Sequence, residues 1–471
     1  MKKTIISVLF VLTAFISCTK EFEKGDFSVP EVEPSGFVLA TFGPQTGHPF
    51  SMENVLKAYG NLPSETRASF SGETIYPTHI YVRFMPSTEE ELWNVKQRKD
   101  LDVYQYPLDC EVTEGFVGID NPFLLNGFPQ LWAVVSEDYS INEIGCPYEI
   151  ESELWMPDLD SIKVRSQSSV DIHDFYEDLM EELCYEQNLT DECSGSATRS
   201  SSTYYPGGIL KYVDTSFGET AVYGMEVEAY TFWHNYKTTS LVSGYLYFGG
   251  KSFSGSFRYR AKFSLNDFAI RNGYSKSDLE YVTDKTTKGF NKTFSGEYSK
   301  YCVVFAAAHR YYYQSLSIPR PPMNGFWKAC LRIHVFPNDS GDSLGNYSTD
   351  ERGFLADRAE IEVYGHGSSS ERSSDELYAT TIHELTHAMH YNINKDLYYS
   401  IEKSVKESLA RGIQLYLTQI RYPSYSMHNG YYNINRYTGF MRDLTDSRKN
   451  VNCSFYETFS SVHYSPSKTY R

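Results

Sequence analysis

Two histidines and a glutamate in the stretch TTIHELTHAMHYN, Thr380 to Asn392, have the types and spacing of a zinc site. If the stretch is helical, His383 and His387 are four residues apart and project from one face, one turn above the other. Imidazole nitrogens bind zinc at about 2.0–2.1 Å, so two stacked rings can reach one ion. Glu384 projects beside them, where a carboxylate can accept a proton from water. The pattern predicts metal-assisted hydrolysis, and the competing interpretation is two hydrogen-bonded histidines on a buried helix.

The flanking residues predict that helix. Ser373 and Glu376 have the spacing of a capping box, in which each side chain bonds a backbone N–H group at the start of a helix. No glycine or proline interrupts Leu377 to Tyr391. The two histidines are therefore expected in the middle of the helix, where their spacing places them on one face.

A catalytic zinc site usually has a third protein ligand, and two candidates follow in the chain. His390 lies on the same helix, seven residues after His383. At 1.5 Å per residue this is about 10 Å along the axis, which one ion cannot bridge. Glu407 lies twenty residues after His387 in the helical stretch SVKESLARGIQLYLT, and two antiparallel helices would bring its carboxylate to both histidines. Ser404 and Glu407 also have capping-box spacing, so the alternative role of Glu407 is to bond a backbone N–H group.

The arrangement resembles the gluzincin, or thermolysin-like, zinc metallopeptidases, whose third ligand is a glutamate at about this spacing on the next helix. The resemblance implies that His383, His387 and Glu407 bind Zn²⁺ and that Glu384 is the general base. The metzincin pattern is excluded, because the chain lacks a glycine three residues after the second histidine and a histidine six residues after it.

Further features of the resemblance concern the surroundings of the site. Gluzincins often carry an aspartate four residues after the third ligand, where it orients a zinc histidine, but Arg411 occupies that place here. They also place a sheet's edge strand beside the active-site helix, and the alternating stretch Ala359 to Tyr364 is expected to be that edge. A Tyr or His after the third ligand stabilises the oxyanion in such enzymes. The candidates are His428, Tyr431, Tyr432, Tyr437 and His463.

The rest of the 471 residues must hold these helices, and composition and periodicity divide the chain into parts. Apolar residues alternate with polar ones from Met225 to Ala229, as in half-buried strands, and the piece GGILKYVDTSFGETAVYGMEVEAY resembles a transthyretin-like sandwich. We expect a multidomain α+β protein. Its expected parts are a mixed N-terminal domain over 36–160, an acidic helix and linker over 161–207, a β-sandwich over 208–273 and a zincin-like α+β catalytic domain over 274–471.

The first residues have the order of an export signal. Lys2 and Lys3 precede an apolar run that is too short to span a bilayer. The run ends in FISC, which resembles a bacterial lipobox and implies a signal peptide over 1–17 with lipid on Cys18. The tract TKEFE, at the start of the expected tether over 18–35, resembles the signal that sends lipoproteins of Bacteroidota to the outer cell surface. An ordinary secretion signal with an incidental cysteine is the alternative.

Charge and the wider resemblance narrow the expected function. The net charge is −17 and no cluster of Lys and Arg is present, which argues against a nucleic-acid partner. The stretches YPTHIYVRFMPSTEEELWNVK and SSDELYATTIHELTHAMHY resemble a group of zinc-metallopeptidase lipoproteins of Bacteroidota. This implies an outer-membrane, cell-surface peptidase that is anchored by lipid and acts on extracellular proteins or peptides. The alternative is a non-catalytic surface lipoprotein that binds a glycan or a host protein, with a vestigial or structural HExxH.

Overall fold

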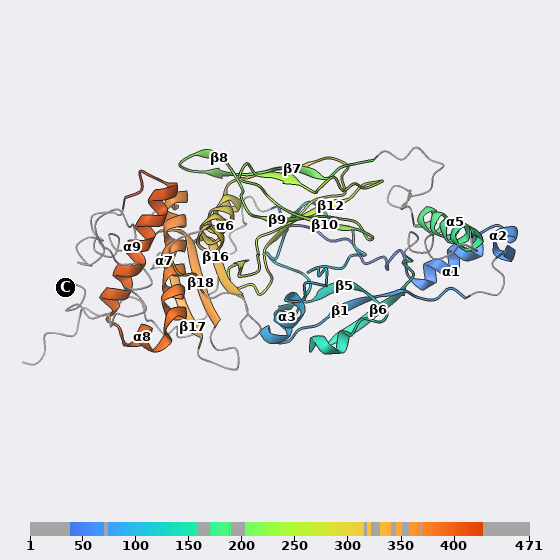
Figure 1. The fold of residues 1–471 in the computed structure, drawn as a ribbon, viewed down its shortest axis with the longest axis horizontal. Helices are drawn as coiled ribbons and strands as arrows, with labels where there is room; N and C mark the ends of the chain where they lie inside the picture. Colours follow the sequence, from blue (N-terminus) through green and yellow to red (C-terminus); the bar gives the residue numbers. More distant parts are fainter. Residues whose placement is uncertain are drawn as a thin grey trace, which may run out of the picture.

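The computed structural model of the protein describes ten stretches of the chain. They are residues 38–69, 74–157, 170–187, 189, 203–314, 318–321, 330–340, 345–350, 358–367 and 370–426. Figure 1 shows an elongated molecule with the helices that carry the predicted zinc site at one end and the first helices of the chain at the other. The fold is mixed α+β, as expected from the sequence. Cys18 and the expected signal peptide and tether lie outside the described residues.

The N-terminal region is a small antiparallel sheet with helices around it. Its strand order is β5-β1-β6. The strands are β1 (His79–Phe84), β5 (Leu131–Ser136) and β6 (Tyr148–Leu154), with a separate short hairpin of β3 (Leu124–Leu125) and β4 (Phe128–Pro129). The helices are α1 (Met52–Asn61), α2 (Ser64–Ser69), α3 (Glu89–Lys96), the 3-10 helix η1 (Ile141–Ile144) and α5 (Val170–Glu186). Helix α5 packs on α1 and confirms the helix expected between the first domain and the sandwich.

The middle of the molecule consists of two sheets packed face to face. The first has the order β10-β9-β12-β14-β2 and the second has the order β11-β7-β15, with β8 paired to β7. The strands of the first are β2 (Gly115–Val117), β9 (Glu226–Tyr230), β10 (Asn235–Thr239), β12 (Arg258–Lys262) and β14 (Glu280–Val282). Those of the second are β7 (Gly207–Asp214), β8 (Gly218–Ala221), β11 (Tyr245–Tyr247) and β15 (Phe290–Phe294). The buried Tyr259 joins the two sheets, because its hydroxyl lies 3.0 Å from the backbone nitrogen of Gly207.

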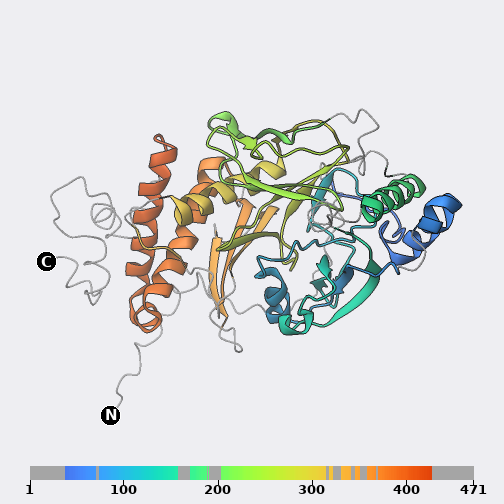
Figure 2. The same cartoon turned by 45° about the vertical axis from the view of Figure 1, so that its right-hand side comes forward.

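The C-terminal region is a four-stranded sheet covered by helices on one face, as Figure 2 shows. The strand order is β13-β16-β18-β17, and only β17 runs antiparallel to its neighbour. The strands are β13 (Phe268–Asn272), β16 (Leu331–Ser340), β17 (Gly345–Asp350) and β18 (Arg358–His366). The helices are α6 (Glu297–Tyr313), α7 (Ser374–Ile393), α8 (Lys395–Ser400) and α9 (Lys403–Arg421).

The strand expected at the edge of this sheet is an interior strand. Ala359 to Tyr364 lies within β18, which pairs with β16 on one side and β17 on the other. The edge strand beside α7 is β17. Ile361 and Val363 are fully buried, while Glu360 and Glu362 are partly buried. The expectation was wrong because this alternation occurs both in edge strands and in interior strands that have one polar face.

The strands do not separate into two sheets at residue 273, the expected boundary between the β-sandwich and the catalytic domain. Strand β13 pairs with β16 of the C-terminal sheet, whereas β14 and β15, which follow it in the chain, pair with β12 and β7 of the middle region. One continuous hydrophobic core runs from Leu210 and Tyr259 between the middle sheets to Leu385 and Leu409 on α7 and α9. The sandwich and the helices of the predicted site therefore share a core.

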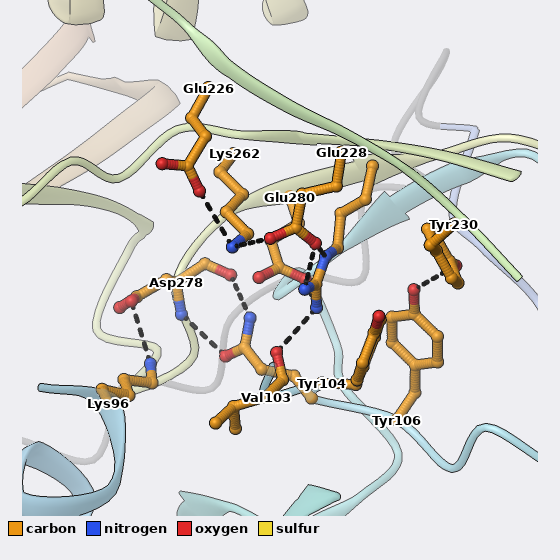
Figure 3. A network of polar contacts seen from close by, with 12 residues as sticks. Lys96, Val103, Tyr104, Tyr106, Glu226, Glu228, Tyr230, Lys262, Asp278 and Glu280 are labelled. Atoms are coloured by element: carbon orange, nitrogen blue, oxygen red, sulfur yellow. Dashed lines mark hydrogen bonds and ion pairs between the residues drawn. The ribbon is translucent and has the colours of Figure 1, made fainter. Parts of the chain in front are cut away.

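Buried charges join the N-terminal region to the middle sheets, and Figure 3 shows this network. The junction cluster consists of Glu226, Glu228, Arg260, Lys262 and Glu280. The fully buried Arg260 pairs with Glu228 through two nitrogens and donates to the carbonyl oxygen of Val103 at 2.8 Å. Its guanidinium carbon also lies 3.9 Å from the centre of the Tyr104 ring. The cluster is thus a polar contact between two regions that are far apart in the sequence.

Two further observations concern the apolar character of the helices and the pairing of the cysteines. Among the described residues, no helix combines the length and the apolar character needed to cross a bilayer. Cys184 on α5 forms a disulfide, and its partner is not among the described residues. The short spacing in the sequence favours Cys193 as that partner, and Cys193 lies outside the described residues.

Candidate metal centre

Helix α7 carries the HELTH residues and is fixed firmly at its start. The carboxylate of Glu376 accepts a hydrogen bond from the backbone N–H of Ser373 at 3.0 Å, which confirms the predicted start of the helix. Ser374 and Thr215 bond each other twice, each side-chain oxygen accepting from the other residue's backbone N–H at 2.9 and 2.8 Å. Thr215 follows β7 in the middle region. The turn after β7 therefore caps the helix that carries the site.

Glu407 meets both histidines from the antiparallel helix α9. Its carboxylate oxygens lie 3.3 Å from the Nε2 atom of His383 and 3.5 Å from that of His387. Helix α9 begins at Lys403 after Glu402, so Glu407 lies inside the helix rather than at the capping position of its first turn. The predicted convergence of the three side chains is confirmed, and the capping role for Glu407 is not observed.

The spacing of these donor atoms suits one metal ion. The Nε2 atoms of His383 and His387 are 3.1 Å apart, and the ligand atoms of the three side chains lie within 4.8 Å of one another. Ligands at about 2.0–2.1 Å in a tetrahedral arrangement are about 3.3 Å from each other. The 3.1 Å between the two Nε2 atoms is close to that edge length, and each imidazole has one oxygen of the Glu407 carboxylate at a similar distance, Oε2 for His383 and Oε1 for His387. His383, His387 and Glu407 form a group that can hold a metal ion, and two imidazoles with one carboxylate suit zinc.

The electrostatics of the group favour a positive charge between the helices. Burial alone would raise the pKa of Glu407, but its contacts with His383 and His387 outweigh burial and hold the pKa far below its usual range. Burial alone would lower the pKa of His383, but Glu407 and the neighbouring Glu384 raise it above the usual value. The two shifts share the attraction between the Glu407 carboxylate and the imidazoles, and the nearby Glu384 carboxylate adds to the shift of His383.

Glu384 lies beside the group and is closely confined. Its side chain is buried, and burial is the main cause that raises its pKa above the usual value. Strand β17 begins against it at Gly345. A Cβ atom on Gly345 would lie 2.8 Å from Cγ and 2.9 Å from Oε1 of Glu384, closer than carbon and oxygen atoms approach. Only a glycine lets the edge strand pass this close to the carboxylate.

Gln414 contacts the face of His383 that points away from Glu407. Its Oε1 atom lies 3.0 Å from Nδ1 of His383, and its amide nitrogen donates to the hydroxyl of Tyr425 at 3.1 Å. Gln414 was not predicted from the sequence, because the gluzincin pattern places an acid at the position of Arg411 instead. Gln414 lies two turns after Glu407, and this seven-residue spacing on one helix face is a signal that could have found it.

The remaining predicted residues fall into two groups. His390 is buried next to the ring of Tyr398, outside the metal-binding group, as the helix geometry predicted. Burial lowers the pKa of His390 to about 3, so it is neutral at ordinary pH. The five candidates for oxyanion stabilisation, His428, Tyr431, Tyr432, Tyr437 and His463, lie outside the described residues.

Comparisons with known proteins give no family. No family model and no curated protein matches the chain. A solved structure of (S)-allantoin synthase is 11% identical, with a TM-score of 0.15, over 29% of this chain and 55% of that one. A 9R-lipoxygenase from Cyanothece is 12% identical, with a TM-score of 0.12, over 49% of this chain and 30% of that one. Both likenesses are too slight to show a shared fold. The chain spans little more than half of the first and under a third of the second.

Proposed function

We propose that the protein is a zinc metallopeptidase that is anchored at the cell surface by lipid on Cys18. The observation that carries the proposal is the convergence of His383, His387 and Glu407, whose ligand atoms lie within 4.8 Å of one another, with the buried Glu384 beside them. The site has the composition of an open catalytic zinc site, which has three protein ligands and keeps a further position for water or substrate. The export signal in the sequence and the disulfide at Cys184 support an oxidising, extracytoplasmic location.

The chain's residues divide the work of hydrolysis between them. His383, His387 and Glu407 hold the ion, which supplies Lewis-acid chemistry by polarising the peptide carbonyl and acidifying water. Glu384 accepts a proton at its carboxylate as the water oxygen bonds to the carbonyl carbon. The C–N bond then breaks, and Glu384 returns that proton to the departing nitrogen. Water is thereby added across one peptide bond without any oxidation or reduction.

The position of β17 supports an extended peptide as the substrate. Among the described residues it is one of the two edge strands of the C-terminal sheet, and its first residue, Gly345, lies next to Glu384. An edge strand offers backbone N–H and C=O groups to a further strand. A peptide paired with β17 would therefore pass next to the general base.

Two substitutions separate metal binding from chemistry. We expect the purified protein to carry one zinc per chain and to cleave peptides in a mixed library, followed by mass spectrometry. Glu384→Gln should keep the zinc and lower the cleavage rate by about 10²–10⁴-fold, the usual contribution of a general base. Glu407→Ala should lose both zinc and cleavage, because one of three ligands is removed. Undiminished cleavage by Glu384→Gln contradicts the mechanism, and a wild-type protein without zinc or cleavage favours the non-catalytic surface lipoprotein.

A further inference from the structure

We infer that Gln414 is the positioning residue of the metal centre and orients His383 through its neutral amide. A carboxylate in that place would orient His383 and would also make it a stronger metal ligand. This inference rests on the metal site proposed above. Its starting observation is the 3.0 Å contact between Oε1 of Gln414 and Nδ1 of His383. Gln414 is 7% exposed, so this contact is sheltered from competing water.

The contact decides which nitrogen of His383 is able to bind metal. An amide oxygen only accepts hydrogen bonds, so Nδ1 of His383 must carry the proton and donate it. The lone pair of the imidazole is then on Nε2, the atom that lies 3.3 Å from Glu407 and 3.1 Å from Nε2 of His387. Gln414 therefore fixes both the tautomer and the ring orientation that the metal-binding group needs.

Tyr425 contacts the other end of the Gln414 amide. The amide nitrogen of Gln414 donates to the Tyr425 hydroxyl at 3.1 Å, and the amide oxygen faces His383. Both ends of the amide therefore have a hydrogen-bond partner, which holds the Gln414 side chain against the imidazole. Tyr425, Gln414 and His383 form one hydrogen-bonded chain.

The middle region holds Tyr425 in place. Its backbone N–H donates to the carbonyl of Tyr422 at 2.9 Å, in the turn that ends α9. The hydroxyl of Tyr422 donates to the buried carboxylate of Asp214 on β7 at 2.6 Å, and the Tyr422 ring stacks on Phe217. The hairpin of β7 and β8 therefore positions the site from two sides, through this turn and through the cap of α7 at Thr215.

A neutral partner has a different consequence for the metal from an acidic one. A carboxylate bonded to Nδ1 adds negative charge and makes the imidazole a stronger ligand, whereas an amide orients the ring without adding charge. At this site a single substitution, Gln414→Glu, can introduce that negative charge. In Gln414→Glu the hydroxyl of Tyr425 can turn and donate to the new carboxylate, so the hydrogen-bonded chain is kept.

The test measures zinc affinity by competition with a fluorescent chelator, which needs no substrate. Gln414→Met removes both hydrogen bonds at similar volume and should weaken zinc binding by about 10–100-fold. Gln414→Glu should bind zinc more tightly than the wild type, by up to about 10-fold. Tyr425→Phe should weaken zinc binding less than Gln414→Met, because the amide remains.

A matched control separates positioning from general damage to the fold. Gln105 is equally buried, and its amide also makes two hydrogen bonds, to the backbone of Asp278 at 2.9 and 3.0 Å, outside the metal centre. Gln105→Met should lower the unfolding temperature without changing zinc affinity. The visible spectrum of the cobalt-loaded protein should change in Gln414→Met and stay as in the wild type in Gln105→Met.

The outcomes separate the inference from the function on which it rests. If the wild type binds zinc, Glu407→Ala does not, and the Gln414 variants bind as the wild type does, the inference is overturned and the proposed function stands. If the wild type binds no zinc, both are overturned. Weaker binding in Gln414→Met together with weaker binding in Gln414→Glu would keep an orienting role and refute the part assigned to charge.

Discussion

The junction cluster and the metal centre are both buried groups of charged side chains, but their carboxylates have different partners. In the junction cluster, Glu228 is fully buried against the permanent cations Arg260 and Lys262. In the metal centre, the ion pairs of Glu407 among the described residues are with His383 and His387, which are cationic only when protonated. The chain thus gives Glu228 permanent counter-charges at any ordinary pH, and it does not do so for Glu407.

The difference separates a structural role from a chemical one. A buried acid with a permanent counter-charge holds two regions in register, and removal of either partner leaves an uncompensated charge. A half-buried acid such as Glu407, which faces imidazoles across 3.3 and 3.5 Å, is suited to attract a cation. Substitutions in the junction cluster should therefore change the free energy of unfolding and leave metal binding intact. Substitutions of the metal ligands should weaken metal binding and change the free energy of unfolding little.

The largest effect on stability is expected from Arg260→Met. This substitution leaves Glu228 paired with Lys262 and, at 3.6 Å, with Lys237, and it removes the contacts with Val103 and Tyr104. Breaking a buried ion pair by removing one partner costs about 3–5 kcal/mol, so the unfolding free energy should fall by about that amount in urea titrations. Zinc affinity of the folded variant should equal that of the wild type.

A double substitution sharpens this result. Arg260→Met combined with Glu228→Leu removes both charges, and replacement of a whole buried pair by apolar groups is often neutral or stabilising. The double variant should therefore recover most of the stability that the single variant loses. If Arg260→Met is as stable as the wild type, or if it loses zinc, the assignment of separate roles to the two clusters is wrong.

The contrast also explains what the sequence could predict. His383, Glu384 and His387 are local, so a helical spacing was enough to place them on one face of α7. Glu407 needed only one further assumption, that its helix runs antiparallel to α7, and α9 does so after the short helix α8. Short-range periodicity carries this information, because helix geometry converts residue spacing directly into direction.

Long-range pairing was not accessible in the same way. The exchange of β13, β14 and β15 between two sheets depends on contacts among strands far apart in the chain, which alternation of residues does not encode. The prediction that Ala359 to Tyr364 forms the edge strand was wrong for the same reason, because a pattern of buried residues does not show which strands lie beside it. Gln414 was not predicted because gluzincins place the orienting acid at the position of Arg411, although its seven-residue spacing from Glu407 puts both side chains on one face of α9.

Gly345→Ala tests the metal centre at a residue that binds no metal. The new Cβ would lie within 3 Å of Glu384 and of Thr380, so either β17 or the Glu384 carboxylate must move. Overpacking of this kind costs about 1–3 kcal/mol. The peptide-cleavage rate should fall by about 10-fold or more because the general base is displaced, while zinc content stays unchanged. Gly367→Ala is the control, because its Cβ would meet the nearest atom at an ordinary 3.6 Å. Equal activity of the two variants would show that the close contact of Gly345 with Glu384 has no role in catalysis.

The smallest effect concerns two acids of the junction cluster whose pKa values shift in opposite directions. Burial tends to raise the pKa of Glu228, but Arg260 and Lys262 outweigh it and hold the pKa below the usual range. Burial raises the pKa of Glu280, and the same two cations only partly offset it. Glu228 therefore contributes stability above its unfolded pKa of about 4.3, and this is lost as the pH falls toward its folded pKa. Glu280 has the opposite sign, since its ionisation is resisted in the folded state and costs stability as the pH rises above about 4.3.

The two substitutions Glu228→Gln and Glu280→Gln test whether Glu228 and Glu280 contribute to stability with opposite dependence on pH. At pH 7, Glu228→Gln should be less stable than the wild type by about 1–3 kcal/mol, and the difference should shrink as the pH falls from about 5 to 3. Glu280→Gln should be as stable as the wild type or more stable at pH 7, and this advantage should disappear over the acidic side of the same titration. Urea unfolding of the zinc-free proteins between pH 3 and 7 measures both curves. Parallel curves for the two variants would mean that the cations of the junction cluster do not distinguish the two acids, and that the cluster is held together by its packing rather than by its charges.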